Sequence, residues 1–305
     1  MAIGPLSHAE ICAKFDRLVS DGIIAYQPSK PVLVADQGMI FCFHIVQTLK
    51  NKPQADDAVQ VVHSSVDPHS GTFGPGSDIA RDHPDVCITI VNETHYLVMN
   101  KFPVFRPMLL LLTVDSYRRQ HESLDREDIA AGWRMICEMK EEHYVFFNCT
   151  VLAGSSRSHK HLQVVPAPGA HEGYGEGFQF FPDYDSMPEE GPPGFVYFLH
   201  RFKNRVLSDG RVQDSEYVLE TYLRLLHQAR EKLHVQDGDI CPHNFVLTKR
   251  WMMVIPRKAK VFHGITANSA AMVGSVYLES EQQLDAWKEV GPMKVLASLG
   301  LPRQQ

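Results

Sequence analysis

The stretch GSSRSHKHLQVVP, from Gly154 to Pro166, constrains the fold of this chain more than any other feature. Its second half has the period of two that a β-strand requires, because successive side chains of a strand point to opposite faces. We therefore expect His159, His161 and Gln163 on one face of a sheet, with the intervening residues on the other face. The fold must offer a strand position directly after a turn of small residues.

The turn before this strand consists of Gly154, Ser155, Ser156 and Arg157. A glycine lets the backbone approach a ligand closely, and successive backbone N–H groups in such a turn can cradle phosphate oxygens. The segment therefore predicts a phosphate-sized anion site beside a row of imidazole and amide side chains.

Imidazole and amide groups beside a phosphate favour a particular reaction. A neutral imidazole is a good nucleophile near neutral pH. If one of the histidines attacked phosphorus, it would form a covalent phosphohistidine and expel a polyphosphate, and a second nucleophile would then take the nucleotidyl group. The amide of Gln163 would hydrogen-bond the non-bridging oxygens as charge redistributes. These residue types predict nucleotidyl transfer by covalent catalysis.

Other interpretations of the two histidines stay open on the sequence alone. A histidine on a half-buried strand is often structural, and the chain contains 16 His, so that one HxH pair can arise by chance. Histidines at positions i and i+2, such as His159 and His161, can also bind a metal ion. Zinc would need a third and a fourth ligand, and none lies nearby in the sequence.

Composition narrows the class of protein. With 44% apolar residues the chain can bury a core, and its formal net charge of -6 gives no global basic field for duplex nucleic acid. None of the 6 Cys forms a CxxC pair, which favours free thiols in a reducing compartment. The N-terminus has no signal-peptide pattern, and no apolar run approaches the ~20 residues of a membrane span. We expect a soluble monomer in the cytoplasm, with the nucleus as the alternative, and no nucleic-acid or membrane partner.

The periodicity of the chain predicts a mixed fold. Helices are expected over residues 6–24, 125–142, 216–234 and 280–300, the last interrupted at Gly291-Pro292. Strands are expected over residues 39–49, 95–102, 108–114, 143–151 and 159–166, and a hairpin over 244–257. Loops rich in Gly and Pro are expected over residues 51–83 and 169–194. Strands mixed with a long helix suggest an α+β sheet covered on one face.

Several motifs together carry a resemblance to a known family. HKHLQ, NCTVLAGSSRS, HYLVMNKFPV, NFVLTKRWMMVIPR and EVGPMKVL resemble the fungal-type diadenosine tetraphosphate phosphorylases, or ATP adenylyltransferases. These belong to the histidine-triad superfamily, on the branch with galactose-1-phosphate uridylyltransferase. The resemblance covers most of the chain, from about residue 41 to 300.

The resemblance implies a fold and a reaction. The fold is α+β, with a histidine-triad-like antiparallel sheet and covering helices in a catalytic region 1–170. A C-terminal α+β region, 195–305, follows the catalytic region and packs on it as one integrated fold. The reaction is cleavage of diadenosine tetraphosphate with phosphate to ATP and ADP through an adenylyl-histidine, with ADP-sulfurylase activity as in some relatives. No cofactor is required, and Mg²⁺ is expected only as a companion of the nucleotide.

The resemblance also implies roles for individual residues. His161 falls on the nucleophile, Gln163 on the residue that contacts the α-phosphate, and His159 on a further catalytic position. The implied substrate-binding residues are Lys52, Asn100, Lys101, Asn148, Gly154, Ser155, Ser156, Arg157, Asn268 and Ser269. No metal ligand is implied.

The chain departs from the family pattern at several of these motifs. Thr150 stands where the family usually has the glycine of an NSG stretch, and Arg157 stands in a segment that usually reads SQPH. Glu279 stands where the family tends to carry a lysine, and a carboxylate near a polyphosphate adds repulsion. The alternatives are therefore a family member with a different substrate, a nucleotide-binding protein without turnover, and a metal hydrolase built on His159 and His161.

Overall fold

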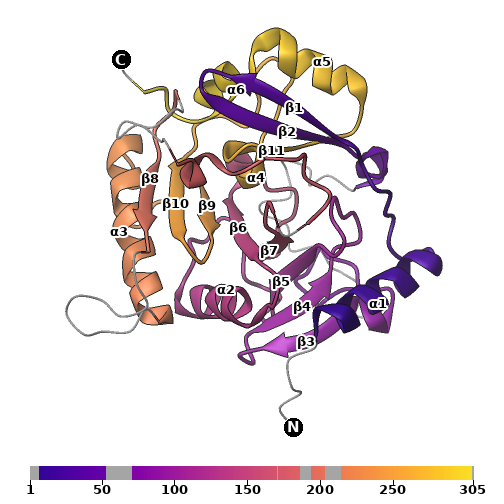
Figure 1. The fold of residues 1–305 in the computed structure, drawn as a ribbon. Helices are drawn as coiled ribbons and strands as arrows, with labels where there is room; N and C mark the ends of the chain where they lie inside the picture. The colour runs from indigo at the N-terminus through magenta and orange to yellow at the C-terminus, as the bar shows by residue number, and fades with distance from the viewer. Residues whose placement is uncertain (1–6, 53–70, 170, 186–193, 203–213, 304–305) are drawn as a thin grey trace.

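The computed structural model describes residues 7–52, 71–169, 171–185, 194–202 and 214–303. The N-terminal segment 1–6 and parts of the predicted loops 51–83 and 169–194 lie outside these described residues. Within the described part, the chain forms an eight-stranded sheet and a three-stranded sheet with α-helices around them (Figure 1).

The larger sheet is antiparallel and places the HKHLQ motif near its centre. Its strand order is β3-β4-β5-β7-β6-β9-β10-β8. The bounds are β3 (Cys87–Val91), β4 (His95–Met99), β5 (Leu109–Thr113), β6 (His143–Cys149), β7 (His161–Pro166), β8 (Phe198–Arg201), β9 (His243–Leu247) and β10 (Trp251–Pro256). Strands of the predicted regions 1–170 and 195–305 thus share one sheet, and β7 lies between β5 and β6.

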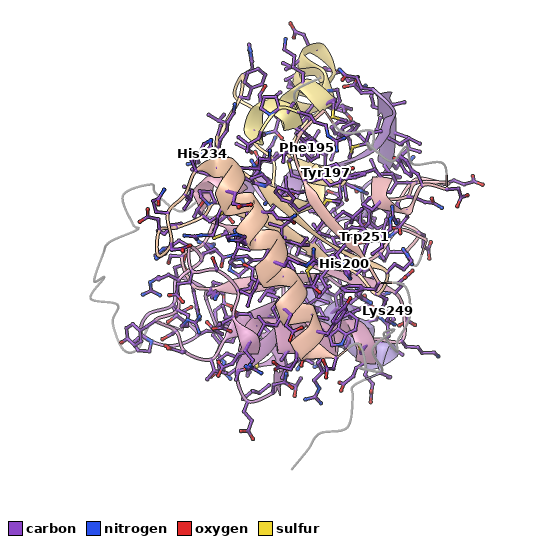
Figure 2. The ribbon with its side chains drawn as sticks, turned by 90° about the vertical axis from the view of Figure 1, so that its left-hand side faces the viewer. Phe195, Tyr197, His200, His234, Lys249 and Trp251 are labelled. Atoms are coloured by element: carbon purple, nitrogen blue, oxygen red, sulfur yellow. The ribbon has the colours of Figure 1, made fainter. Side chains whose placement is uncertain are left out.

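One face of this sheet packs against three amphipathic helices. They are α1 (His8–Ser20), α2 (Arg126–Glu138) and α3 (Ser215–Leu233), and their buried side chains share one hydrophobic core with the sheet. Asp125 caps α2 with a reciprocal bond to Asp128, which explains why the helix begins there. Figure 2 shows α3 running from its end near His234 past β8, where His200 Nε2 lies 2.9 Å from the hydroxyl of Tyr217.

The other face packs against a layer made by both ends of the chain. Strands β1 (Pro31–Asp36) and β2 (Met39–Ile45) form the smaller sheet with β11 (Ser275–Leu278), which is parallel to β2. Helices α4 (Ser269–Met272), α5 (Glu281–Val290) and α6 (Pro292–Leu299) complete this layer. In Figure 1 the indigo N-terminal strands and the yellow C-terminal helices lie together at the top.

The expectation of a sheet covered on one face is wrong, because both faces are buried. In β6, Tyr144 and Phe146 belong to the core under the smaller sheet, while Val145 and Phe147 belong to the core under the helices. The continuous apolar run of β6 is typical of a strand buried on both sides. The predicted α+β class, with an antiparallel sheet and covering helices, is confirmed.

Most predicted elements exist, with shifted ends. The hairpin and the helix break at Gly291-Pro292 are confirmed by β9, β10, α5 and α6. Helix α2 ends at Glu138 rather than residue 142, and β7 begins at His161 rather than His159. Strands β1, β3, β8 and β11 were not predicted. None of the helices in the described ranges is long and apolar enough to cross a bilayer.

Candidate active site

The backbone of His161 is held from the side by Gln120. Its backbone N–H donates to Gln120 Oε1 at 2.8 Å, and Gln120 Nε2 donates to the carbonyls of His161 at 3.0 Å and Asn148 at 3.2 Å. One glutamine side chain therefore fixes the end of β6 and the start of β7 relative to each other. The sequence gives no signal for this role, because Gln120 lies in an ordinary loop segment.

The ring of His161 is neutral, with Nε2 directed away from its backbone partner. Nδ1 donates to the carbonyl of His159 at 2.8 Å, so the lone pair lies on Nε2. Burial lowers the pKa of His161 to about 4, and the charges of Lys52 and Arg157 act in the same direction. The side chain is 7% exposed, and no described residue hydrogen-bonds to Nε2. The geometry is that of a poised nucleophile.

His159 occupies a different environment from His161. Its ring is fully buried, with Nδ1 2.7 Å from Ser77 Oγ and Nε2 2.9 Å from Thr113 Oγ1. Because β7 begins at His161, the expected common face holds for His161 and Gln163 and does not include His159. His159 orients His161 through its carbonyl, and a direct catalytic role for its ring stays a prediction.

His161 and Gln163 line a cavity whose wall contains both apolar and polar side chains. Its apolar lining includes Phe73, Ile79, Val86, Val98, Phe102 and Leu110. Its polar lining includes Lys52, Asn100, Lys101, Ser156 and Arg157, all of them expected site residues. Such a cavity suits a flat apolar group that continues into an anionic group.

Two cations of this cavity form no close ion pair among the described residues, and the nearby charge of Asp78 only partly opposes the effect of burial on the pKa of Arg157. Lys52 and Arg157 are half-buried, and neither forms an ion pair with a described carboxylate. Burial and the charge of Arg157 lower the pKa of Lys52 to about 8, and burial also lowers the pKa of Arg157. Lys101, in contrast, pairs with Asp82. Lys52 and Arg157 therefore favour a bound anion between them.

The turn of small residues from Gly154 to Arg157 is a nest, a concave stretch of backbone whose N–H groups can bind an anion. Gly154 has φ 89°, and a Cβ there would lie 2.6 Å from the carbonyl oxygen of Ala267, so only glycine fits. The backbone N–H groups of Ser156 and Arg157 donate to no acceptor in the described ranges.

Asp78, which was not predicted from the sequence, anchors the turn by accepting from the N–H groups of Ser158 and His159. Ser155 is not among the residues that line the cavity of His161, and its hydroxyl donates to the carbonyl of Arg157 at 2.9 Å.

Asn148 and Ser269 form a buried joint between the two layers. Asn148 Oδ1 accepts from Ser269 N at 2.8 Å and from Asn244 Nδ2 at 3.0 Å, and it lies 2.7 Å from Ser269 Oγ. Neither Asn148 nor Ser269 lines the cavity, so their place is behind it. Asn244, on β9, was not predicted from the sequence. The joint attaches α4 to the end of β6, just below α4 in Figure 1.

A second cavity adjoins the first along the nest. It shares Lys52 and Ser156 with the first cavity and is also lined by Gly154 and Asn268. The opposite wall includes Trp287, Val276, Leu278 and Glu279. Asn268 also caps α4 by accepting from Ala271 N at 3.0 Å.

The remaining expectations concern Asn100 and metal ligands. Asn100 lines the first cavity, while its Oδ1 accepts from Phe102 N at 2.9 Å and so shapes the turn after β4. Among the described residues, no cluster of three or more His, Cys, Asp or Glu side chains is arranged to hold a metal ion.

Comparison with known families gives matches along most of the chain. The profile of the Ap4A phosphorylase N-terminal domain matches residues 9–175, which is more than half of the chain. The profile of the ATP adenylyltransferase C-terminal domain matches residues 193–302.

Similar proteins occur in Saccharomyces cerevisiae. Protein APA1 is 28% identical over 218 residues, and diadenosine 5',5'''-P1,P4-tetraphosphate phosphorylase 2 is 25% identical over 220 residues. These alignments cover 63% and 62% of this chain, and they span 63% of the length of each relative.

Solved structures share the fold. The crystal structure of yeast Ap4A phosphorylase Apa2 in complex with Ap4A superposes with a TM-score of 0.72 at 20% identity, covering 97% of both chains. The complex of the same enzyme with AMP also gives a TM-score of 0.72, at 20% identity over 97% of this chain and 98% of the other.

Proposed function

The chain belongs to the Ap4A phosphorylase family, and on that premise we propose that it cleaves diadenosine tetraphosphate (Ap4A) with inorganic phosphate to ATP and ADP. The observation that carries the proposal is the lone pair on His161 Nε2, at a cavity lined by apolar side chains and by the cations Lys52 and Arg157. The apolar side chains suit an adenine, and the cations suit its phosphates.

The reaction divides into two displacements at the same phosphorus. His161 Nε2 attacks the α-phosphorus, a P–N bond forms, the bond to the bridging oxygen breaks, and ATP leaves. The hydrogen bond from Nδ1 to the carbonyl of His159 stabilises the positive charge that the ring acquires. A phosphate oxygen then attacks the adenylyl phosphorus, the P–N bond breaks, and ADP leaves with the imidazole neutral again.

Other groups of the site stabilise charge rather than break bonds. The amide of Gln163 would bind a non-bridging oxygen of the α-phosphate from the same face as His161. Lys52 and Arg157 would offset the charge on the departing ATP, and the N–H groups of the nest would bind its oxygens. The adjoining cavity gives room for the far part of the dinucleotide.

We propose further that the protein binds no metal of its own and that Mg²⁺ enters with the nucleotide, where it offsets phosphate charge. We also propose a monomer that acts in the cytoplasm, with the nucleus as the alternative, and that binds no nucleic acid. The net charge of -6 supports the last point. Light scattering on the purified protein tests the oligomeric state.

The test of the reaction is a product assay with Ap4A and inorganic phosphate. The expected products are ATP and ADP in equal amounts, and replacing phosphate by sulfate tests the sulfurylase-type exchange. The variant His161→Asn keeps a polar side chain of similar size and should abolish both products while still binding Ap4A. Binding of Ap4A without products from the unsubstituted protein would instead indicate a nucleotide-binding protein without turnover.

Glu279 supports a second candidate, a family member with a different substrate. Its carboxylate lines the adjoining cavity, where the far end of a dinucleotide would lie. A carboxylate there disfavours phosphate groups and favours hydroxyl or amino groups. A panel of nucleotides that share an adenylyl group and differ at the far end separates the candidates. Turnover of another member of the panel, with Ap4A inert, would establish the second candidate.

A further inference from the structure

Arg257 is a buried cation whose partners among the described residues are all neutral. It follows β10 and is 0% exposed. Its guanidinium donates to five acceptors, of which four are carbonyl oxygens and one is an amide oxygen. They are Ala267 O at 2.9 Å, Ala153 O at 3.4 Å, Leu299 O at 3.2 Å, Ala259 O at 3.3 Å and Asn244 Oδ1 at 2.5 Å. No carboxylate within the described ranges forms an ion pair with it.

A buried cation without an anion is costly. Burial lowers the pKa of Arg257 to about 9, since hydrogen bonds to neutral oxygens replace only part of its hydration. Another fully buried cation of this protein does have a carboxylate partner. Lys160 is also 0% exposed, but its Nζ lies 2.6 Å from Asp128 Oδ2. Of these two buried cations, only Arg257 therefore lacks a carboxylate partner among the described residues.

The position of Arg257 places this charge directly behind the wall of the adjoining cavity. The carbonyl of Ala153 belongs to the peptide that links it to Gly154, and the carbonyl of Ala267 belongs to the peptide that links it to Asn268. Gly154 and Asn268 both line the cavity. The guanidinium is thus one peptide unit away from the surface on which the phosphate chain would lie.

We propose that Arg257 is a positioning residue for polyphosphate, whose unpaired charge behind the nest stabilises the phosphate chain that it never touches. In a buried environment a charge acts through several ångströms with little screening, so an anion on the nest offsets the missing counterion. The inference rests on the proposed function for its substrate class. It deepens that function, because it assigns part of the phosphate affinity to a residue outside both cavities.

A merely structural Arg257 would behave differently under substitution. Arg257→Lys keeps the charge but loses most of the forked hydrogen bonds, whereas Arg257→Gln keeps a polar side chain and loses the charge. If only the hydrogen bonds matter, both variants should disturb the nest and weaken every ligand alike. If the charge matters, only the glutamine variant should weaken anions, and neutral ligands should bind as before.

The test uses inorganic tripolyphosphate and adenosine as separate probes, titrated by calorimetry into the whole chain. Neither probe can adenylylate His161. For Arg257→Gln we expect tripolyphosphate to bind about tenfold or more weaker, with adenosine changed by less than about threefold. For Arg257→Lys we expect both affinities within about threefold of the unsubstituted protein.

Arg230 supplies a control for the loss of an arginine charge elsewhere in the fold, where the cation has a carboxylate partner, Asp237. It also donates to backbone carbonyls, among them Asp239 O at 2.9 Å and Gln236 O, but it lies on α3 and lines neither cavity. Arg230→Gln should leave tripolyphosphate affinity unchanged. An equal loss in the Arg230 and Arg257 glutamine variants would overturn the inference.

Two further outcomes separate an effect of the Arg257 charge from an effect of its hydrogen bonds. Loss of tripolyphosphate binding in a folded Arg257→Lys variant, to the extent seen with glutamine, would show that geometry and not charge is at work. If Arg257→Gln does not fold, the lysine variant alone decides, since retained affinity supports the charge and a tenfold loss contradicts it. Neither result depends on turnover, so failure of the Ap4A assay stays distinguishable from failure of this inference.

Discussion

At the scale of single residues, Thr150 stands out because its backbone conformation is one that glycine adopts. It has φ 76° and ψ 167°, a region nearly closed to β-branched side chains. Its buried hydroxyl has no partner among the described residues. Thr150 links β6 to the turn that carries the nest, at the position where the resemblance implies a glycine.

Replacing Thr150 by glycine should therefore stabilise the protein. Relief of backbone strain, less the entropy cost of glycine, predicts a gain of about 1–2 kcal/mol in the free energy of unfolding. Urea denaturation measures it. Thr89→Gly in β3 is the control, because the φ of Thr89 lies outside the left-handed region and loss of its side chain should destabilise the strand. If both variants lowered the free energy of unfolding by a similar amount, the backbone of Thr150 would not be strained.

The lowered pKa of His161 predicts the pH profile of the first displacement. An ordinary imidazole loses half of its neutral form near pH 6.5. With a pKa of about 4, His161 stays neutral well below that point, so the rate of ATP release from Ap4A without added phosphate should stay level down to about pH 5.5. Single-turnover kinetics measure this rate. A midpoint near pH 6.5 in a protein that circular dichroism shows to be folded would be inconsistent with the buried neutral ring.

At the scale of elements, the start of β7 presents the cavity residues on one side and is held by a buried ion pair on the other. His161 and Gln163 face the cavity, and Lys160, the residue directly before β7, points to the opposite side, where it pairs with Asp128 of α2 and donates to the carbonyl of Ser123 at 2.8 Å. Asp128 also accepts from His95 at 3.1 Å. The ion pair joins the strand that carries the nucleophile to a covering helix.

Breaking this pair should be costly. Lys160→Met leaves the carboxylate of Asp128 buried without its cation, which predicts a loss of about 3–5 kcal/mol in the free energy of unfolding. The exposed pair between Arg126 and Glu216 is the control, and Arg126→Met should cost less than about 1 kcal/mol. Chemical denaturation compares the two variants, and equal losses would refute the role of burial.

The elements that the sequence predicted are those with long local patterns. Helix α3 shows its apolar face over 19 residues, and the β9-β10 hairpin needs only neighbouring residues. Strands β8 and β11 have 4 residues each, and β11 pairs in parallel with β2, more than two hundred residues away in sequence. Such pairing leaves no local pattern, so propensity could not predict it.

At the scale of the whole molecule, the stability should fall in mild acid. Burial lowers the pKa of His44 to about 3 and those of His143, His161 and His243 to about 4. Between about pH 6.5 and 4 the unfolded chain takes up protons at these sites while the folded chain does not. The free energy of unfolding is therefore highest above pH 6.5 and decreases as the pH falls towards 4.

Urea denaturation at pH 7.5 and pH 5 measures this effect. We expect a clearly lower free energy of unfolding at pH 5, before carboxylates of ordinary pKa are protonated. Asp128 adds to the loss only at lower pH, because the hydrogen bond from His95 and the charge of Lys160 outweigh burial and hold its pKa well below its usual range. Equal stability at both pH values would mean that these histidines are not buried as neutral rings.

The candidate site was predictable where function follows from a local motif. The HxHxQ spacing and the small-residue turn suffice to place His161, Gln163, Ser156 and Arg157 around one cavity. Three residues act only through contacts with residues outside their own sequence motif, namely Gln120, Asp78 and Arg257. No local sequence pattern could therefore predict their roles. The environment of His159 depended on where β7 begins, and strand ends are set by tertiary packing.

The proposed reaction depends on adenylylation of His161, which peptide mapping by mass spectrometry detects. The protein is incubated with Ap4A in the absence of phosphate, and one equivalent of ATP should be released. We expect one adenylyl group on the peptide that contains His161, and this group should disappear with formation of ADP when phosphate is added. An adenylyl group on any other residue, or ATP release from a protein that stays unmodified, would contradict it.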